Sequence, residues 1–210
     1  MRFLALLLSL ISSVAVAEIS ESQCKEIESK VREGDIAFIN VDNWLYRQVA
    51  AATKGWTTHV GIVLREDNKW IVAESTIPFS KKTPFCNFIR KTDHDQYSIR
   101  RLGHIELAMK EVVQIKADVN ANLGRVYDFY FNYDAPRLFC SKFVYDLIKQ
   151  STGIEVGKVQ TLGEIRDSNP QGDTTFWEYW FLGNVPWEQR TITPQNMYED
   201  AKLMTVSEKL

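Results

Sequence analysis

Two short runs of β-forming residues constrain the fold of this chain most strongly. Residues 59–64 read HVGIVL, residues 69–75 read KWIVAES, and four polar residues, REDN, separate them. Valine, isoleucine and tryptophan are enriched in strands, and a short polar connection between two such runs is typical of a hairpin. The sequence therefore predicts an antiparallel β-hairpin.

The segments around this hairpin predict helices and strands without regular alternation. Further strands are expected at residues 36–39 and 97–102, and helices at residues 43–52, 106–120 and 139–149, while residues 22–31 form a short amphipathic stretch. Residues 76–95 are predicted to be irregular, and the remainder of the chain after Gly153, which includes the aromatic run 176–189, to add late strands and a wrapping tail. Because no βαβ pattern is present, we expect an α+β fold, with an antiparallel sheet or small barrel packed against helices.

The first 17 residues differ in character from the rest of the chain. They begin with a positive charge at Arg2, continue as an almost wholly apolar run, and end in the A-x-A cleavage pattern of residues 15–17. The run is shorter than the roughly 20 residues needed to span a bilayer. We predict a cleaved signal peptide at residues 1–17, a single domain at residues 18–210, no transmembrane segment after its removal, and a periplasmic or secreted location.

The charge and the cysteines limit the classes of partner. The chain of 210 residues carries a formal net charge of −2 at pH 7, whereas binding of nucleic-acid phosphates requires a basic surface. Cys24, Cys86 and Cys140 lie far apart and form no C-x-x-C pair, which gives a zinc site little support. We expect no nucleic-acid partner and no metal or organic cofactor, and the sequence does not predict an oligomeric state.

An odd number of cysteines leaves one of them unpaired in an oxidising compartment. The simplest arrangement pairs Cys24 with Cys86 and leaves Cys140 free. Three pairings are compatible with the sequence, so this arrangement is one of several.

The hairpin also brings together two residues that can transfer a proton. If Leu64 faces Lys69 across the turn, His59 lies directly opposite Glu74, with Cβ atoms roughly 4.5–5.5 Å apart. A three-residue loop would place Ser75 opposite instead. A carboxylate beside an imidazole fixes its tautomer and supports the imidazolium form, although a purely structural His–Glu pair is the alternative.

Cys140 stands at the start of a predicted amphipathic helix. The N–H groups and the dipole at a helix N-terminus favour an anion and lower the pKa of a thiol, and the thiolate is the nucleophile in covalent catalysis. The alternative is a buried apolar cysteine, because Cys140 shares a helical face with Val144 and Ile148. The other histidines, His94 in a charged segment and His104 before a helix, are expected to be poorer bases.

The order of several motifs resembles that of a known enzyme group. GDIAFIN, THVGIVL, VAES, GRVYDFYF and LFCSKFVYDLI, between about residues 34 and 153, are similar to the circularly permuted, YiiX-like branch of the NlpC/P60 papain-like cysteine peptidases and amidases. The resemblance implies a permuted papain-like fold with Cys140 as nucleophile, His59 as general base and Glu74 as third member of a triad. Phe139 and Lys142 replace the Tyr and Glu that members often carry at these positions, which leaves the substrate preference open.

Three functions are compatible with these residues. The first is an exported cysteine hydrolase, an amidase or endopeptidase that cleaves amide bonds of cell-wall peptides through a thioester acyl-enzyme. The second uses the same thiol to deacylate lipids or fatty amides or to transfer an acyl group, and the third is a non-catalytic binding module on this fold. The expected partner is a peptide or acyl-amide substrate. Tyr127, Asp128 and Trp56 are candidates for binding it, with packing roles as the alternative.

Overall fold

The computed structural model describes residues 19–103 and 105–210. The predicted signal peptide and His104 lie outside these ranges. The helices are α1 (Glu21–Glu28), α2 (Trp44–Thr53), α3 (Phe85–Ile89), α4 (Met109–Ala121), α5 (Cys140–Thr152), α6 (Leu162–Ser168), α7 (Thr175–Trp180) and α8 (Pro194–Tyr198). The strands are β1 (Ile36–Val41), β2 (His59–Glu66), β3 (Lys69–Glu74), β4 (Lys81–Pro84), β5 (Thr92–Leu102), β6 (Gln160–Thr161), β7 (Arg190–Thr191) and β8 (Leu203–Lys209).

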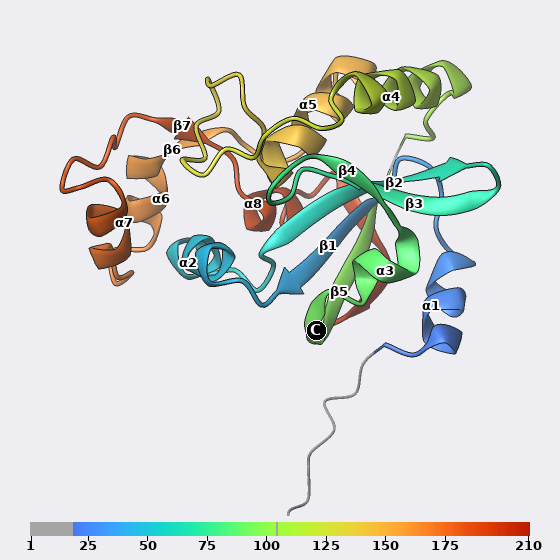
Figure 1. Cartoon of the computed structure of the whole chain (residues 1–210), viewed down its shortest axis with the longest axis horizontal. Helices are drawn as coiled ribbons and strands as arrows, with labels where there is room; N and C mark the ends of the chain where they lie inside the picture. Colours follow the sequence, from blue (N-terminus) through green and yellow to red (C-terminus); the bar gives the residue numbers. More distant parts are fainter. Residues whose placement is uncertain (1–18, 104) are drawn as a thin grey trace, which may run out of the picture.

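A six-stranded antiparallel sheet forms the centre of the molecule, with the strand order β4-β3-β2-β1-β5-β8. Helices α4 and α5 lie on one side of it and helices α1 and α3 on the other (Figure 1). Strands β6 and β7 form a separate two-stranded sheet. This arrangement confirms the predicted α+β class. In the described ranges, no helix is both long and apolar enough to cross a bilayer.

Each face of the sheet carries its own hydrophobic core. Alternate residues of a strand point to opposite faces, and β2 follows this rule. Val60, Ile62 and Leu64 pack with residues of α4 and α5, whereas Val63 packs with residues of α1 and α3. The sheet is therefore buried on both sides, which explains why the HVGIVL run is apolar almost throughout.

The hairpin exists as predicted, but its predicted register is wrong by two residues. Glu66 pairs with Lys69, and Leu64 faces Ile71 rather than Lys69. The turn consists of the two residues Asp67 and Asn68, with φ values of 46° and 61°. Asp and Asn tolerate positive φ, and a two-residue turn of this kind matches the twist of the strands. A shift of two residues leaves every side chain on its original face.

Two other segments differ from the prediction. Residues 76–95 are not irregular, because they contain β4, α3 and the start of β5; β4 pairs with β3, and α3 buries Phe85 and Phe88. The remainder after Gly153 adds the expected late strands β6, β7 and β8, but it also contains helices, and its aromatic run begins with α7. There Phe176 and Trp180, four residues apart, have ring centroids 5.6 Å apart. Both segments depend on contacts that a local pattern does not reveal.

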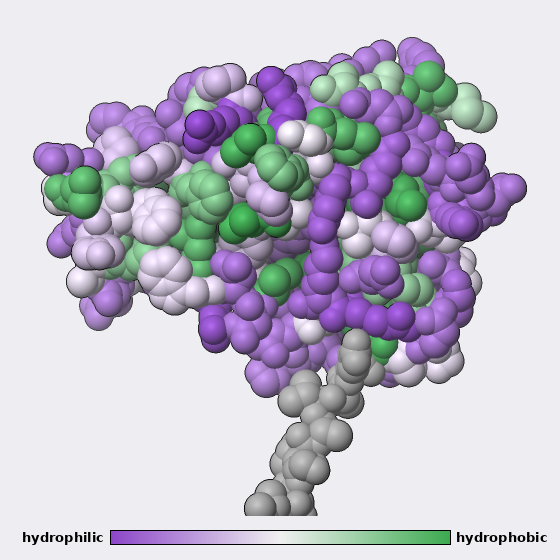
Figure 2. Space-filling view, in the orientation of Figure 1, coloured by the Kyte–Doolittle hydropathy of each residue, from purple (hydrophilic) through white to green (hydrophobic). Residues whose placement is uncertain are grey.

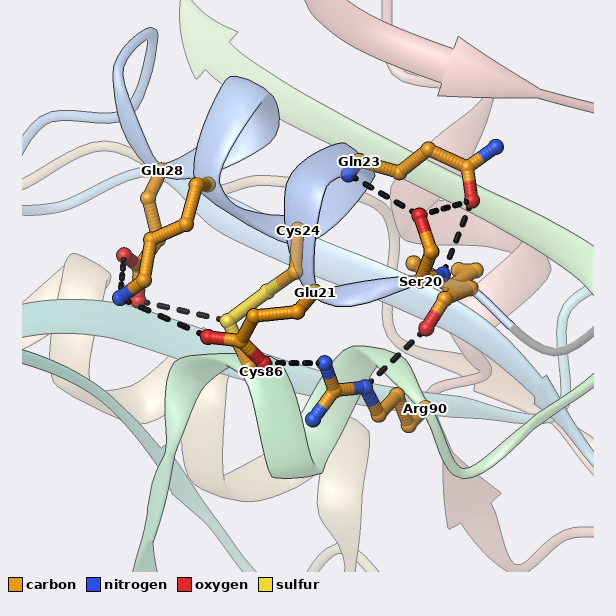
Figure 3. The surroundings of a disulfide bond; sticks show 9 residues. Ser20, Glu21, Gln23, Cys24, Glu28, Cys86 and Arg90 are labelled. Atoms are coloured by element: carbon orange, nitrogen blue, oxygen red, sulfur yellow. Dashed lines mark hydrogen bonds and ion pairs between the residues drawn. A yellow bond between two sulfur atoms is a disulfide. The ribbon is translucent and has the colours of Figure 1, made fainter.

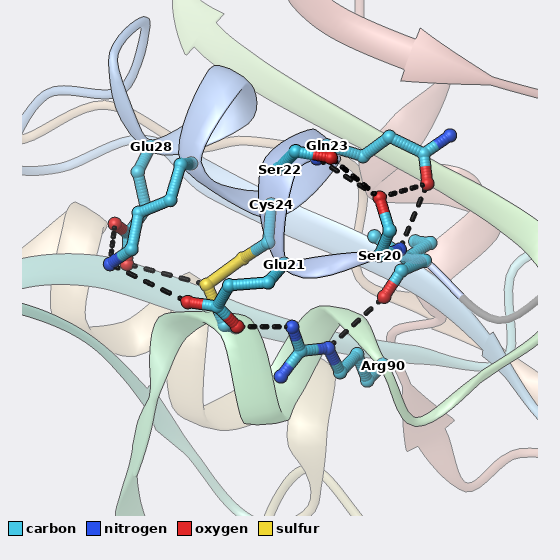
Figure 4. Close-up of polar contacts among 10 residues, drawn as sticks. Ser20, Glu21, Ser22, Gln23, Cys24, Glu28 and Arg90 are labelled. Atoms are coloured by element: carbon cyan, nitrogen blue, oxygen red, sulfur yellow. Dashed lines mark hydrogen bonds and ion pairs between the residues drawn. A yellow bond between two sulfur atoms is a disulfide. The ribbon is translucent and has the colours of Figure 1, made fainter.

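The expected cysteine pairing is confirmed. Cys24 of α1 and Cys86 of α3 form a disulfide with Cα atoms 5.6 Å apart (Figure 3), and Cys140 is free and buried. Arg90, which follows α3, adds two contacts to the N-terminal part of the chain: it donates to the carbonyl oxygen of Ile19 at 3.1 Å and to Glu21, the first residue of α1, at 2.5 Å (Figure 4). Helix α3 is thus tied to the N-terminal segment covalently and by ionic contact.

Candidate active site

Helix α5 holds Cys140 at its first position. Its apolar side chains recur at helical spacing and are buried, and Gly153 ends the helix in the left-handed conformation with a φ of 73°. Ser141 fixes the start of the helix, because its Oγ donates to the carbonyl oxygen of Ile192 at 2.7 Å. Cys140 itself is only 3% exposed. The sulfur therefore occupies a defined position at a helix N-terminus.

His59, the first residue of β2, is bonded to Glu74 at the end of β3. Nε2 of His59 lies 2.6 Å from Oε2 of Glu74, and the two residues are 1% and 0% exposed. Nδ1 of His59 is buried and has no hydrogen-bond partner in the described part of the chain. The contact assigns the Nε2 proton to the bond with Glu74 and leaves Nδ1 available to exchange a proton.

The groups around His59 and Glu74 favour the charged form of each side chain, the imidazolium of His59 and the carboxylate of Glu74. Burial lowers the pKa of His59, but the neighbouring Cys140 and Glu74 together raise it to about 9. Burial raises the pKa of Glu74, but His59 and Lys91 bring it down to about 2. Cys140 thus lies close enough to His59 to change its protonation, although the thiol does not make an aligned hydrogen bond to Nδ1. Such bonds are often loose without substrate.

The structure brings together the three residues that the sequence predicted as a triad. Two aromatic residues that the sequence analysis missed hold the imidazole in place. Tyr46 of α2 stacks on the ring of His59, with centroids 5.5 Å apart and planes inclined by 6°. Phe88 of α3 lies on the ring with a centroid distance of 5.7 Å. No sequence signal pointed to either residue, since each lies in a separate helix.

The predicted substrate-binding residues lie in different surroundings. Tyr127 is fully buried and lines a pocket whose wall also includes Cys140. Its hydroxyl has no hydrogen-bond partner among the described residues. Asp128 uses its carboxylate inside its own loop, where it accepts from the backbone N–H groups of residues 130 and 132. Trp56 packs against Tyr198 with a centroid distance of 5.3 Å and is not among the residues that line this pocket.

A pocket that is open to solvent has Cys140 in its wall. It lies between α2, the start of α5, α6, α7 and the segment around β7. Its apolar lining includes Val49, Phe131, Phe139, Leu162, Ile165, Trp177, Val185, Trp187 and Ile192. Figure 2 shows apolar and weakly polar side chains gathered at the end of the molecule where α6 and α7 lie. The sequence analysis did not predict this pocket, because its walls come from distant segments.

Potential metal ligands gather at one place in the described ranges. The three potential ligand atoms there lie within 4.8 Å of one another and belong to Cys24, Glu28 and Cys86. The two sulfurs are bonded to each other, so they do not offer thiolate ligands in this state. The side chain of His94, which was expected to be a poorer base, is 71% exposed and lies near Asp93.

Comparison with known proteins agrees with this geometry. A family model described as permuted papain-like amidase enzyme, YaeF/YiiX, C92 family, matches residues 30–207. Uncharacterized protein YiiX of Escherichia coli strain K12 is 27% identical over 176 residues, which cover 84% of this chain and 86% of that protein. A crystal structure described as that of metalloprotein yiiX from Escherichia coli O157:H7 matches with a TM-score of 0.78 and 26% identity, over 86% of this chain and 98% of the other.

These matches confirm the resemblance seen in the motifs and the papain-like fold, and they support a hydrolase. Since the family model spans most of the sequence, the chain belongs to the permuted papain-like amidases of the YaeF/YiiX, C92 family.

Proposed function

We propose that the protein is an exported cysteine amidase in which Cys140, His59 and Glu74 form the catalytic triad. One observation carries this proposal: the buried imidazole commits Nε2 to Glu74 and leaves Nδ1 without a partner beside Cys140. A purely structural His–Glu pair gains nothing from such an unpaired nitrogen, because an unsatisfied buried polar group costs about 1–3 kcal/mol. A general base requires this arrangement.

In the proposed reaction, the thiolate of Cys140 forms a bond to the amide carbonyl carbon, and the carbonyl oxygen takes the negative charge. The N–H groups of the first turn of α5 have no partner within the helix and supply donors for that oxygen. The imidazolium of His59 then gives its Nδ1 proton to the amine nitrogen as the C–N bond breaks, which leaves a thioester. Neutral His59 takes a proton from water, whose oxygen attacks the thioester and releases the carboxylic acid and the thiolate.

Tyr127 is the best placed of the proposed substrate-binding residues. Burial and the neighbouring Cys140 raise the pKa of its hydroxyl well above the usual value, so the group stays protonated. Because this hydroxyl lies in the pocket wall without a partner among the described residues, it can donate a hydrogen bond to a bound substrate. For Asp128 the bonds within its loop support an indirect role, through the position of that loop.

The proposed location is the periplasm or the cell exterior. The leader-like residues 1–17 support export, and the disulfide between Cys24 and Cys86 is of a kind that persists in oxidising compartments. A protein in that location would meet cell-wall peptides, which makes them the first substrate class to test.

The apolar pocket favours a second candidate, in which the same thiol removes or transfers a fatty acyl group. Apart from polar residues such as Arg166, Asn169 and Asp173, the wall is dominated by aliphatic and aromatic side chains. Burying each CH₂ group of an acyl chain there would contribute roughly 0.8 kcal/mol. A stem peptide, which carries charged and amide groups, would leave many of these contacts unused.

Trapping of the acyl-enzyme tests the proposal and separates the two candidates. The mature protein is incubated with peptidoglycan fragments and, in parallel, with N-acyl amino acids of increasing acyl length. We expect a mass increase equal to the acyl half, located on Cys140, removed by hydroxylamine, and absent from Cys140→Ala. A peptidic adduct supports the first candidate and a fatty acyl adduct the second. If no adduct forms and Cys140 reacts with iodoacetamide as an ordinary thiol does, the binding-module alternative is correct.

A further inference from the structure

Glu74 has a second oxygen that does not face His59, and that oxygen is also occupied. Thr83 of β4 donates its hydroxyl proton to Oε1 at 2.5 Å. The ammonium group of Lys91 donates to the same oxygen. With Oε2 bonded to His59, the carboxylate makes three hydrogen bonds while it is 0% exposed. Two of the three contacts lie on the side away from the imidazole.

Lys91 is placed by the same helix that packs on the imidazole. It follows α3 and precedes β5, and its ammonium lies 5.2 Å from the ring centroid of Phe88. Phe88 in turn contacts the ring of His59. Helix α3 is fixed to the N-terminal segment by the disulfide and by Arg90, as Figures 3 and 4 show. Because α3 is held in this way, the lysine has a defined position and is not a freely moving surface group; its side chain is 29% exposed.

We propose that Lys91 is a positioning residue of the amidase. Its ammonium holds Oε1 of Glu74 so that Oε2 faces His59, and its charge keeps the carboxylate ionised throughout the reaction. The inference rests on the proposed function, because it assigns Lys91 a role in the triad described there. Lys91 acts through Glu74 and does not touch the reacting atoms.

The reaction itself creates the need for this second cation. While His59 is an imidazolium, Glu74 has a positive partner. Once His59 has given its proton to the leaving amine, Glu74 would be a buried carboxylate without any counterion, a state that burial strongly disfavours. Thr83 supplies a hydrogen bond but no charge. Lys91 supplies the charge in both halves of the cycle, so the carboxylate is still ionised when His59 must take a proton from water.

In the described part of the chain, the titratable groups that face the carboxylate or its partners His59 and Lys91 are Lys81 of β4, Tyr46 of α2 and Cys140 of α5. Burial lowers the pKa of Lys91, and Glu74 opposes this effect. Lys81 pairs with Glu74 in the sheet but is exposed. Lys81→Met therefore offers a matched control. It removes a charge of the same sign from a neighbouring position whose side chain makes no bond to the carboxylate.

The test compares Lys91→Met, Lys91→Arg and Lys81→Met with the wild-type protein. The probe is iodoacetamide, and the rate of Cys140 alkylation in the folded, disulfide-bonded protein is followed by mass spectrometry from pH 4 to pH 9. In Lys91→Met we expect the acid limb of the rate profile to move up by about one pH unit or more, and the plateau to fall by about tenfold or more, because a hydrogen bond to a charged group is lost. Lys91→Arg should restore most of the rate, and Lys81→Met should match the wild type.

Several outcomes would overturn the proposal. An acid limb in Lys91→Met that stays in place or moves to lower pH, with only the melting temperature reduced, would show that Lys91 merely ties β5 to β3. If Lys91→Arg does not restore the rate of alkylation, the positive charge at residue 91 is not what supports Glu74. If Lys91→Met does not fold, Lys91→Gln retains a donor without the charge and should show the same shift. A wild-type profile like that of an ordinary thiol would instead contradict the proposed function, so the two failures are distinguishable.

Discussion

His59 and Glu74 are diagonal neighbours on strands β2 and β3, and their side chains meet with 2.6 Å between Nε2 and Oε2. Diagonal neighbours on one face remain within reach of long side chains. The pair that directly follows Ile62 and Ala73 in this register is Gly61 and Glu74. A Cβ atom on Gly61 would lie 2.4 Å from the side chain of Val72 and 2.9 Å from the carbonyl oxygen of Ala73. The lack of a side chain at residue 61 therefore permits the close approach of the strands next to the dyad.

The first prediction concerns the carboxylate of this pair. Glu74→Gln keeps the shape of the side chain but removes the charge that supports the imidazolium of His59. We expect kcat/KM for amide hydrolysis to fall by roughly 10²–10⁴, measured on the substrate identified by trapping. Glu66→Gln, at the other end of the same hairpin, is the matched control and should retain activity. A Glu74→Gln protein with wild-type activity would exclude Glu74 from the triad.

The second prediction is a pH window for stability. The pKa of His59 is raised from 6.5 to about 9, so its contribution to the free energy of unfolding is complete below pH 6.5 and is lost as the pH rises toward 9. The pKa of Glu74 is lowered from 4.5 to about 2, so its contribution is complete above pH 4.5 and is lost as the pH falls toward 2. The pair should stabilise the fold most between about pH 4.5 and 6.5.

Urea unfolding at a series of pH values measures this window. In the wild-type protein the free energy of unfolding should decline from pH 6.5 to pH 9, and His59→Gln should remove the part of that decline that comes from His59. Equal slopes in both proteins would show that His59 is not held as an imidazolium in the folded state.

The sequence was sufficient to predict the parts of the site that local patterns encode. The β-rich runs predicted the hairpin that carries His59 and Glu74, and apolar spacing predicted the helix that begins with Cys140. The register was missed because it depends on the turn. The two-residue turn at Asp67 and Asn68 contains no glycine, and four polar residues are compatible with several loop lengths.

No comparable sequence pattern indicated the residues that surround His59 and Glu74. Tyr46 and Lys91 reach His59 and Glu74 from α2 and from the segment after α3. Strand β4, which supplies Thr83, and helix α3 are short, and they are stabilised by pairing with β3 and by burial of Phe88. Because such contacts join residues far apart in the chain, neither periodicity nor composition reveals them.

The third prediction concerns the disulfide. The bond joins residues separated by 62 positions, and a cross-link over such a span stabilises a fold by about 4 kcal/mol in the loop-entropy model, with measured values often lower. The double variant Cys24→Ser, Cys86→Ser should lose about 2–4 kcal/mol in urea unfolding. As an internal control, a phosphine reductant should destabilise the wild-type protein to a similar extent and leave the double variant unchanged. Insensitivity of the wild-type protein would show that the bond is absent in solution.

The last prediction tests which part of a substrate the apolar pocket accepts. Ala52 of α2 lines this pocket, whereas the neighbouring Ala51 is exposed on the same helix. Ala52→Trp should fill much of the space beside Cys140. If the pocket binds the acyl half, the KM for N-acyl amino acids with long chains should rise by about tenfold or more, since each CH₂ group excluded costs roughly 0.8 kcal/mol. Short N-acetyl substrates should be cleaved as before, and Ala51→Trp should behave as the wild type with both. An equal loss on long and short substrates would mean that the tryptophan disturbs the triad itself, and no loss on either would place the acyl half outside the pocket.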